Sequence, residues 1–338
     1  MRLATPRWWY RRRPPAPLTR ALLRPAAWIW AAATAARIAR GRPIDPGAPV
    51  ICVGNLTLGG TGKTPVVRAL AQRLAAKGSH AHVLTRGYGG RLRGPLRADP
   101  MVHTAVDVGD EALMMAADAP VWTARDRAAG ARAAAAAGAS LVVMDDGHQN
   151  PSLKKALSLV VVDGETRDGE WPFGDGAVFP AGPMREPLAA GLARADAVVV
   201  VLPVDLEAPD AELTGLFDGK TLLLARLVPA RDPPAGPQLG FAGIGKPWKM
   251  ERALVAAGCD LVDFAPLPDH ARYDERTLRF LARRAKALGA GLVTSEKDWV
   301  KLPPEWRDRV AFWPVEARFE DERALDALLG SALGAAAA

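Results

Sequence analysis

The chain has 338 residues, of which 49% are hydrophobic and 24% charged, and this composition excludes an intrinsically disordered protein. Its length allows two domains of ordinary size, each with its own core. Two cysteines are too few for a disulfide framework, which favours a reducing compartment.

The positive charge is concentrated at the N-terminus. Residues 1–44 hold ten arginines and no acidic residue, so the rest of the chain carries −3 of the net +7. The apolar run at 25–36 is shorter than the ~20 residues that span a bilayer. Together with Trp28 and Trp30, the arginines favour an interfacial helix on an anionic membrane surface. A core-packed helix, a nucleic-acid arm and a cleaved signal peptide are the alternatives, and no nucleic-acid motif follows.

A phosphate-binding loop is predicted directly after this arm. An apolar run at 50–53 leads into a Gly-rich turn, and Lys63 and Thr64 open a helical pattern. Strand, glycine loop and helix are the context of a P-loop, in which backbone N–H groups and the helix N-terminus bind phosphate. Lys63 would contact the β- and γ-phosphates, and the Thr64 hydroxyl would bind Mg²⁺. Thr57 stands where such loops usually have their first glycine.

Strand and helix signals alternate from residue 48 onward, which predicts an α/β fold with a P-loop NTPase-like parallel sheet flanked by helices. Strands are expected at 50–53, 82–86, 121–123, 141–144, 157–163 and 196–202, with helices at 65–77 and 125–137. A Pro-rich segment at 229–237 suggests a domain boundary. A glycine turn at 243–247 is expected near the active-site cleft. The expected units are an N-terminal membrane-surface arm at 1–44, a P-loop domain at 45–225, a linker at 226–238 and a second, smaller α/β domain at 239–338.

Two adjacent acids close a buried strand pattern further along the chain. Asp145 and Asp146 follow the run 141–144, where a P-loop protein places the carboxylates that hold Mg²⁺. Because two neighbouring acids repel each other without a cation, the metal interpretation is favoured over a solvated turn. Strand alternation points the two side chains in different directions, so their roles should differ.

Phosphorylation of a hydroxyl also needs a base that takes the proton of the acceptor. The chain has five histidines, and the residue pattern alone does not choose among them: His80, His82, His103, His148 and His270.

The motifs together resemble those of the tetraacyldisaccharide 4′-kinase family, the lipid A 4′-kinases of Gram-negative bacteria. The matching segments run in order along most of the chain: 54–55, 59–65, 85–89, 108–111, 145–147, 183–186, 241–244, 269–273 and 294–298. The resemblance implies transfer of the γ-phosphate of MgATP to the 4′-hydroxyl of a tetraacyl glucosamine disaccharide 1-phosphate, giving the 1,4′-bisphosphate (lipid IVA) in lipid A biosynthesis. It also implies a peripheral location on the cytoplasmic face of the inner membrane.

Roles are carried over by motif. Asp110 and His270 match the acid–histidine pair of the family; we expect Asp110 to orient His270, which then activates the sugar hydroxyl, as the second domain closes over the first. Arg185 is expected in the same cleft. The expected catalytic residues are Asp110, His270, Asp146 and Lys63; the metal-supporting residues are Thr64, Asp145, Asp146 and Glu186; the ATP-binding residues are Asn55, Thr57, Gly59, Gly60, Thr61, Gly62, Lys63, Thr64, Arg86 and Tyr88.

One motif departs from the family pattern. The family usually reads Asp-Asp-Gly-Phe-Gln-His, whereas this chain has His148 and Asn150 in place of the Phe and the His. Asn150 cannot take a proton, which leaves His148 as the local substitute for any acid–base role there.

The alternative function is a membrane-associated P-loop ATPase switch of the partitioning type, with no phosphoryl acceptor. Such proteins carry a second lysine just before the paired glycines, where this chain has Leu58. They would also have no need of Asp110, His270 or a second α/β domain. A membrane scaffold with a vestigial nucleotide site conflicts with the intact Lys63-Thr64 pair and the adjacent acids.

Overall fold

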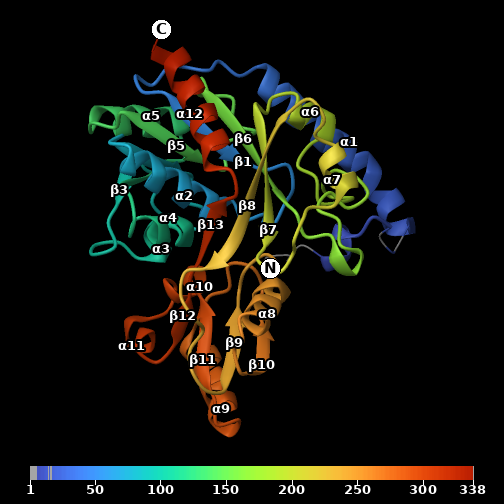
Figure 1. The fold of residues 1–338 in the computed structure, drawn as a ribbon, viewed down its shortest axis with the longest axis vertical. Helices are drawn as coiled ribbons and strands as arrows, with labels where there is room; N and C mark the ends of the chain where they lie inside the picture. Colours follow the sequence, from blue (N-terminus) through green and yellow to red (C-terminus); the bar gives the residue numbers. More distant parts are fainter. Residues whose placement is uncertain (1–5, 14, 16, 338) are drawn as a thin grey trace.

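In the computed structural model, which describes residues 6–13, 15 and 17–337, a nine-stranded sheet forms the larger of two domains (Figure 1). The strand order is β13-β8-β7-β6-β1-β5-β2-β4-β3, and every pair is parallel except the outermost pair at each edge. The bounds are β1 Val50–Gly54, β2 Ala81–Thr85, β3 Leu96–Ala98, β4 Val121–Thr123, β5 Leu141–Asp145, β6 Leu157–Asp163, β7 Ala197–Pro203, β8 Thr221–Pro229 and β13 Val315–Phe319.

Helices cover both faces of this sheet, which is why its central strands are apolar along their whole length. One face packs on α2, α4 and α12, and the other on α5 and on the segment around Trp171 and Phe173. The predicted P-loop-type parallel sheet is therefore confirmed. The helix bounds are α2 Lys63–Ala76, α3 Ala105–Val108, α4 Asp110–Met115, α5 Arg127–Ala136, α6 Leu188–Leu192, α7 Ala211–Gly215 and α12 Glu322–Ala337.

A second, parallel sheet forms the smaller domain, in the order β10-β9-β11-β12 (Figure 1). Helix α9 packs on one face and α8 on the other. The expected second α/β unit is thus present. Its elements are β9 Gln238–Ala242, α8 Pro247–Ala256, β10 Leu261–Pro266, α9 Glu275–Ala287, β11 Gly291–Ser295, α10 Glu296–Trp299, α11 Pro304–Arg307 and β12 Ala311–Trp313.

The division of the chain differs from the expected one at both ends of the second domain. Strand β8 runs into the expected linker and ends at Pro229, where the Pro-rich segment begins, and β13 pairs with it antiparallel as the edge strand of the first sheet. Helix α12 then packs on α2, where Arg73 binds Asp326 at 2.6 Å. The second domain is therefore an insertion between two paired strands. Sequence patterns show elements in chain order, and they do not show that the last strand returns to the first sheet.

The N-terminal arm divides into a buried part and an exposed part. The short helix η1 (Arg7–Tyr10) buries Tyr10, which is 1% exposed and donates its hydroxyl hydrogen to the Leu58 carbonyl of the P-loop. Helix α1 (Pro17–Ala39) lies along the surface of the first domain, with Trp28 and Ile29 about 70% exposed. Among the described residues, no helix is long and apolar enough to cross a membrane. Residues 1–5, 14 and 16 of the expected arm lie outside the described residues.

Candidate active site

The P-loop lies between β1 and α2, at the carboxyl edge of the sheet. Gly62, the residue before α2, has φ = 83°, and a Cβ there would stand 3.0 Å from the Val201 side chain, so glycine is required. Among the described residues, no side chain caps the N-terminus of α2. Its first N–H groups, together with Lys63 and Thr64, are therefore available to an anion.

The Gly-to-Thr exchange at Thr57 has a structural reason. Thr57 pairs with Met184 in an isolated antiparallel bridge, an extended pairing that does not need glycine. The neighbouring Leu58 N–H donates to the Pro183 carbonyl at 2.8 Å. From the other side, the buried Asn55 amide donates to the Thr57 carbonyl at 2.8 Å. The long irregular segment before Pro187 thus supports the P-loop.

The two adjacent acids lie where β5 ends, beside the P-loop. Asp145 is buried and its Oδ2 accepts a hydrogen bond from the Thr85 hydroxyl at 3.2 Å. Asp146 turns the other way: its Oδ1 accepts from Arg185 Nη1 at 2.8 Å and lies 3.5 Å from Lys63 Nζ. The structure therefore brings Lys63, both acids and Arg185 together, as the sequence predicted, and gives the acids different partners.

The surroundings push the pKa values of these two acids apart. Burial raises the pKa of Asp145, and the neighbouring Asp146 raises it further. Burial also acts on Asp146, but the Arg185 and Lys63 cations outweigh it and hold the pKa of Asp146 well below its usual range. Asp145 Oδ1 is buried and has no hydrogen-bond partner among the described residues. An oxygen in that state is a suitable ligand for a cation.

Glu186 lies close to the P-loop, with both of its carboxylate oxygens already engaged. Each of them is 2.6 Å from Arg194 Nη2. Gln149 donates to Glu186 at 3.0 Å and to the Asn55 carbonyl at 2.9 Å, which connects Glu186 to the start of the loop. Support of a metal by Glu186 stays a prediction, and direct ligation would require the ion pair with Arg194 to open.

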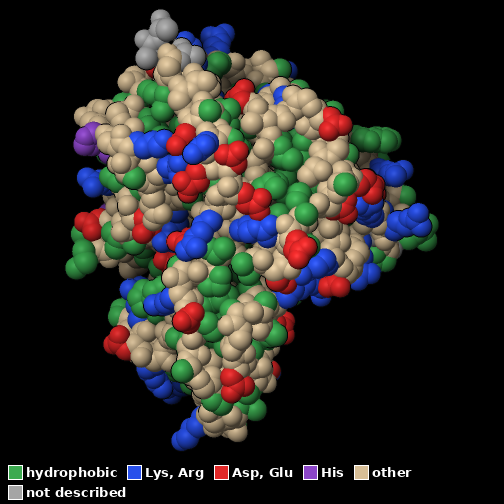
Figure 2. Space-filling model, viewed as in Figure 1, with side chains coloured by type: hydrophobic (Ala, Val, Ile, Leu, Met, Phe, Trp, Pro, Cys, Tyr) green, Lys and Arg blue, Asp and Glu red, His purple; other side chains and the backbone are tan. Residues whose placement is uncertain are grey.

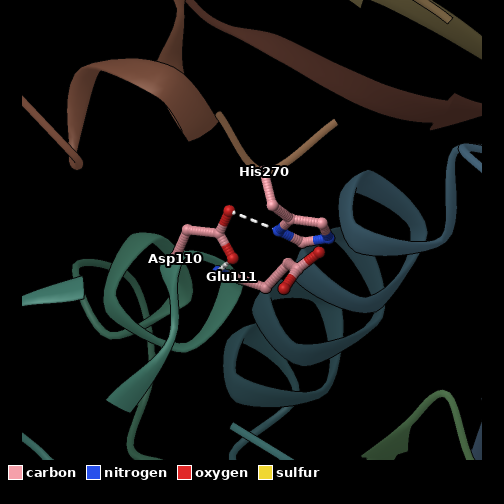
Figure 3. A group of neighbouring side chains, drawn as sticks. All are labelled: Asp110, Glu111 and His270. Carbon is pink, nitrogen blue, oxygen red and sulfur yellow. Dashed lines mark hydrogen bonds and ion pairs between the residues drawn. The ribbon is translucent and has the colours of Figure 1, made fainter. Parts of the chain in front are cut away.

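The acid–histidine pair is formed by residues from different domains (Figure 3). Asp110 and Glu111 begin α4 in the first domain, and His270 reaches them from the loop after β10 in the second. His270 Nδ1 lies 2.9 Å from Asp110 Oδ2. The pair predicted from the family resemblance is therefore in contact.

Electrostatics decides which nitrogen of His270 carries the proton. Burial would raise the pKa of Asp110, but the hydrogen bond from His270 and the charge of Lys297 outweigh it, so this pKa lies well below its usual range. An ionised Asp110 accepts only, hence Nδ1 is the donor. In the neutral imidazole the lone pair is then on Nε2, which lies 3.9 Å from Asp269, beyond hydrogen-bonding distance. Nε2 can therefore act as a base.

Two of the catalytic candidates have left-handed backbones. Asp146 has φ = 52° and His270 has φ = 55°, and Asp168 is the one further non-glycine residue with positive φ in the described part of the chain. Such conformations carry strain and concentrate at functional sites. Both positions were predicted as catalytic on other grounds.

A single loop after β2 runs from Asp145, one of the two adjacent acids, to the acid–histidine pair. Thr85, at the end of β2, contacts Asp145, and three residues later the Tyr88 ring lies 4.9 Å from the His270 ring. Arg86, between them, is exposed. Contact of Arg86 and Tyr88 with ATP stays a prediction; Tyr88 packs on the histidine.

Asp110, Glu111 and His270 also offer three ligand atoms within 4.8 Å of one another. Two lysines already supply positive charge there. Lys297 Nζ lies 2.8 Å from Glu111, and Lys301 Nζ lies 3.9 Å from Asp110. We therefore interpret the cluster as an acid–base group balanced by lysines, and not as a metal site.

The glycine turn of the second domain packs directly on the P-loop. A Cβ on Gly245 would stand 2.6 Å from the Gly60 nitrogen, so only glycine permits the approach. The next residue, Lys246, is buried with its Nζ 2.6 Å from Asp163 and 4.2 Å from the Tyr10 ring. The sequence predicted the turn near the cleft. It gave no signal for the partners Tyr10 and Asp163, which lie far away in the chain.

The two departures from the family motif are structural. Both ring nitrogens of His148 are engaged, with the Ser158 hydroxyl at 3.1 Å and the Gly191 carbonyl at 2.9 Å. The Asn150 amide oxygen accepts from the N–H and the hydroxyl of Ser152 in a local turn. The buried His148 therefore faces the interior and not the acids, contrary to the idea that it replaces an acid–base group.

A solved structure shares this fold. The chain matches the crystal structure of an "apo" form LpxK from Aquifex aeolicus in complex with ATP, with a TM-score of 0.71. The match covers 94% of this chain and 100% of that one, at 23% sequence identity.

Comparisons of sequence find one family along nearly the whole chain. The model of the tetraacyldisaccharide-1-P 4′-kinase family matches residues 19–334. A tetraacyldisaccharide 4′-kinase of Phenylobacterium zucineum is 69% identical over 331 residues, covering 98% of this chain and 99% of the relative. One of Caulobacter vibrioides is 66% identical over 330 residues, covering 97% and 98%.

Proposed function

This chain belongs to the tetraacyldisaccharide-1-P 4′-kinase family, and we propose that it transfers the γ-phosphate of ATP to the 4′-hydroxyl of a tetraacyl glucosamine disaccharide 1-phosphate. The product would be the 1,4′-bisphosphate, lipid IVA. One observation carries the proposal: a histidine from the second domain is held by a buried aspartate of the first, and the same second domain packs on the P-loop through Gly245. A protein that only binds or hydrolyses ATP has no use for that pair.

ATP would bind at the carboxyl edge of the large sheet. Lys63 and the N–H groups at the start of α2 would hold its β- and γ-phosphates. The donor set beside them fits Mg²⁺: the Thr64 hydroxyl, Asp146, and the unpartnered buried oxygen of Asp145, with Glu186 nearby. When bound, Mg²⁺ would neutralise charge on the phosphates.

The residues of this chain would then manage the proton of the acceptor. His270 Nε2 takes the proton of the 4′-hydroxyl while the oxygen of that hydroxyl forms a bond to the γ-phosphorus. The bond from that phosphorus to the β–γ bridging oxygen breaks, and ADP leaves with the electron pair. Asp110 keeps the imidazole in the required tautomer and stabilises the imidazolium that forms.

The test is direct. Purified protein, MgATP and the disaccharide 1-phosphate in detergent should give a lipid heavier by one phosphate, with a new phosphomonoester signal in the ³¹P spectrum. The acceptor lacking a free 4′-hydroxyl is the matched control. ATP hydrolysis without any phosphorylated lipid would support the ATPase switch instead.

We propose further that α1 places this site on the cytoplasmic face of the inner membrane, where its lipid substrate resides. Figure 2 shows basic and hydrophobic side chains next to each other at the right-hand edge of the molecule, where α1 runs in Figure 1. Arg24 and Arg37 are exposed on the same helix as Trp28 and Ile29, and the exposed Arg40 directly follows the end of that helix. An exposed apolar surface with arginines beside it suits anionic lipid headgroups.

Two substitutions on α1 test the membrane proposal better than a deletion does, because Tyr10 of the arm supports the P-loop. Trp28→Ser with Ile29→Ser should lower flotation with anionic vesicles by about tenfold or more, since each large apolar side chain contributes ~1.5–3 kcal/mol when buried. Val255→Ser on α8, at 59% exposure, is the matched control. Equal flotation of the double variant and the control would contradict the proposal.

A further inference from the structure

The segment 294–298 is one of those that resemble the family, and none of its residues is a candidate catalytic, metal-supporting or ATP-binding residue. In the structure it is the end of β11 and the single-turn helix α10. Ser295 caps this turn: the Asp298 N–H donates to its oxygen at 3.1 Å, and its hydroxyl donates to Asp298 Oδ2 at 2.6 Å. A short, capped turn presents its charged side chains in fixed directions.

Two of these side chains reach from the second domain to the first. Glu296 binds Arg68 of α2, the helix that follows the P-loop, at 2.6 Å. Lys297 binds Glu111 of α4 at 2.8 Å. Helix α10 lies at the junction of the two domains in Figure 1, so these contacts are made where the domains meet.

The contacts of Lys297 bracket the acid–histidine pair. Its Nζ lies 2.8 Å from Glu111, the neighbour of Asp110, and 3.7 Å from Asp269, the neighbour of His270. One ammonium group thus contacts the residues that adjoin both members of the pair.

A further contact from α10 supports the backbone of His270. Asp298 is fully buried, and its Oδ2 accepts from the Gly243 N–H at 3.0 Å. The Gly243 carbonyl accepts from the His270 N–H at 3.1 Å. The left-handed backbone at His270 is therefore held from α10 as well.

We propose that Lys297 is a positioning residue of this kinase: by joining Glu111 to Asp269 it holds His270 against Asp110 when the two domains meet. The proposal rests on the proposed function for its catalytic consequence. Lys297 would touch neither ATP nor sugar and would act through His270.

Charge explains why the lysine is needed. Asp110, Glu111 and Asp269 bring three carboxyl groups to one small, partly buried volume. Without Lys297 only Lys301, 3.9 Å from Asp110, would offset their charge, and the repulsion that remains would favour separation of the two loops that carry the pair. Burial would lower the pKa of Lys297, but the Glu111, Asp110 and Asp269 carboxylates outweigh it and raise that pKa, so the lysine stays charged.

Three variants test the role. Lys297→Met keeps the length of the side chain and removes its charge; Lys297→Arg keeps the charge. Arg284→Met is the matched control, because among the described residues Arg284 forms its ion pair with Asp263, inside the second domain. Each variant is measured for kcat and KM of ATP with the disaccharide 1-phosphate, and for hydrogen exchange of the segment 268–273.

Lys297→Met should lower kcat by about 10- to 100-fold, because displacing a reacting group by an ångström has an effect of that size. KM for ATP should change by less than about twofold, since the P-loop lies in the first domain. Lys297→Arg should restore most of the rate, and Arg284→Met should match the wild type. Exchange in 268–273 should rise only in Lys297→Met. The double variant Lys297→Met with Glu111→Gln should lower kcat by a smaller factor than the product of the factors for the two single variants.

Wild-type kcat and exchange in Lys297→Met would overturn the proposal. The proposal would also be overturned if KM for ATP rose by the same factor as kcat fell and exchange became faster throughout the second domain. That result would mean that Lys297 stabilises the fold of the domain in general. If the wild-type protein phosphorylates no lipid, the proposed function fails; the exchange of 268–273 in Lys297→Met against Arg284→Met still decides whether Lys297 holds the histidine loop.

Discussion

The two halves of the catalytic centre are built in different ways. The phosphate half lies at the edge of one sheet: Lys63 begins the helix that follows β1, and Asp145 and Asp146 lie at the end of the neighbouring parallel strand β5. The proton-transfer half joins Asp110 and His270, which are 160 residues apart and belong to different domains. The first half is fixed by a buried core, whereas the second exists only while the domains are in contact.

This difference predicts separate failures. Changes in the phosphate half should weaken both nucleotide binding and turnover. Changes in the cross-domain half should leave nucleotide binding intact and act on turnover alone, because the P-loop needs no contact from His270. One variant in each half tests that separation.

The largest effect is expected from the cross-domain half. His270→Ala should lower kcat by ~10²–10⁴, the range typical for loss of a general base. The affinity for ATP, measured by calorimetry without lipid, should stay within about twofold of the wild type. Turnover equal to that of the wild type would remove His270 from the mechanism, and a parallel loss of ATP affinity would show that the halves are not separate.

A somewhat smaller effect on turnover is expected from the phosphate half. Lys63→Met should lower kcat by ~10²–10³, the usual cost of removing one preorganised donor from developing charge. Unlike His270→Ala, it should also weaken ATP binding in calorimetry, because the ammonium group would contact the β- and γ-phosphates. Arg68→Met, on the same helix but bound to Glu296 and Asp118, serves as the control for ATP binding. Unchanged ATP affinity in Lys63→Met would contradict this assignment.

The same contrast explains what could be predicted from the sequence. The phosphate half is local: a strand, a Gly-rich turn and Gly62-Lys63-Thr64 are consecutive, and Asp145-Asp146 end an obvious buried strand. His270 carried no such signal, because residue pattern alone left five histidines equal. Only the family resemblance selected it, and only the tertiary structure shows its contact with Asp110.

Long-range packing also accounts for what was not predicted. Strand β8 was not predicted, because it ends at Pro229, where the Pro-rich segment begins. Strand β13 returns to the first sheet after the whole second domain. Tyr10 was assigned to a membrane arm, yet it reaches the P-loop. Each of these depends on a partner distant in the chain, and periodicity carries no information about such partners.

The smallest effect concerns the core beneath the phosphate half, where His148 is buried. Burial lowers the pKa of His148 to about 4, from an unfolded value of about 6.5. Between these values the unfolded chain binds a proton that the folded chain does not. The contribution of neutral His148 to the free energy of unfolding is therefore complete above about pH 6.5. It is lost as the pH falls toward 4, which lowers the free energy of unfolding by up to about 3 kcal/mol.

Replacing this histidine should flatten the acid response. In His148→Phe, the free energy of unfolding from urea titrations should fall less steeply between pH 6.5 and 4 than in the wild type, whatever its value at pH 7. His80→Gln, at an exposed position, should keep the wild-type slope. Because the Cβ and backbone of His148 pack closely against Gly54 at the end of β1, acid should weaken the phosphate half from within its core, independently of domain contact. Identical slopes in His148→Phe and the wild type would show that the acid sensitivity of this half has another origin.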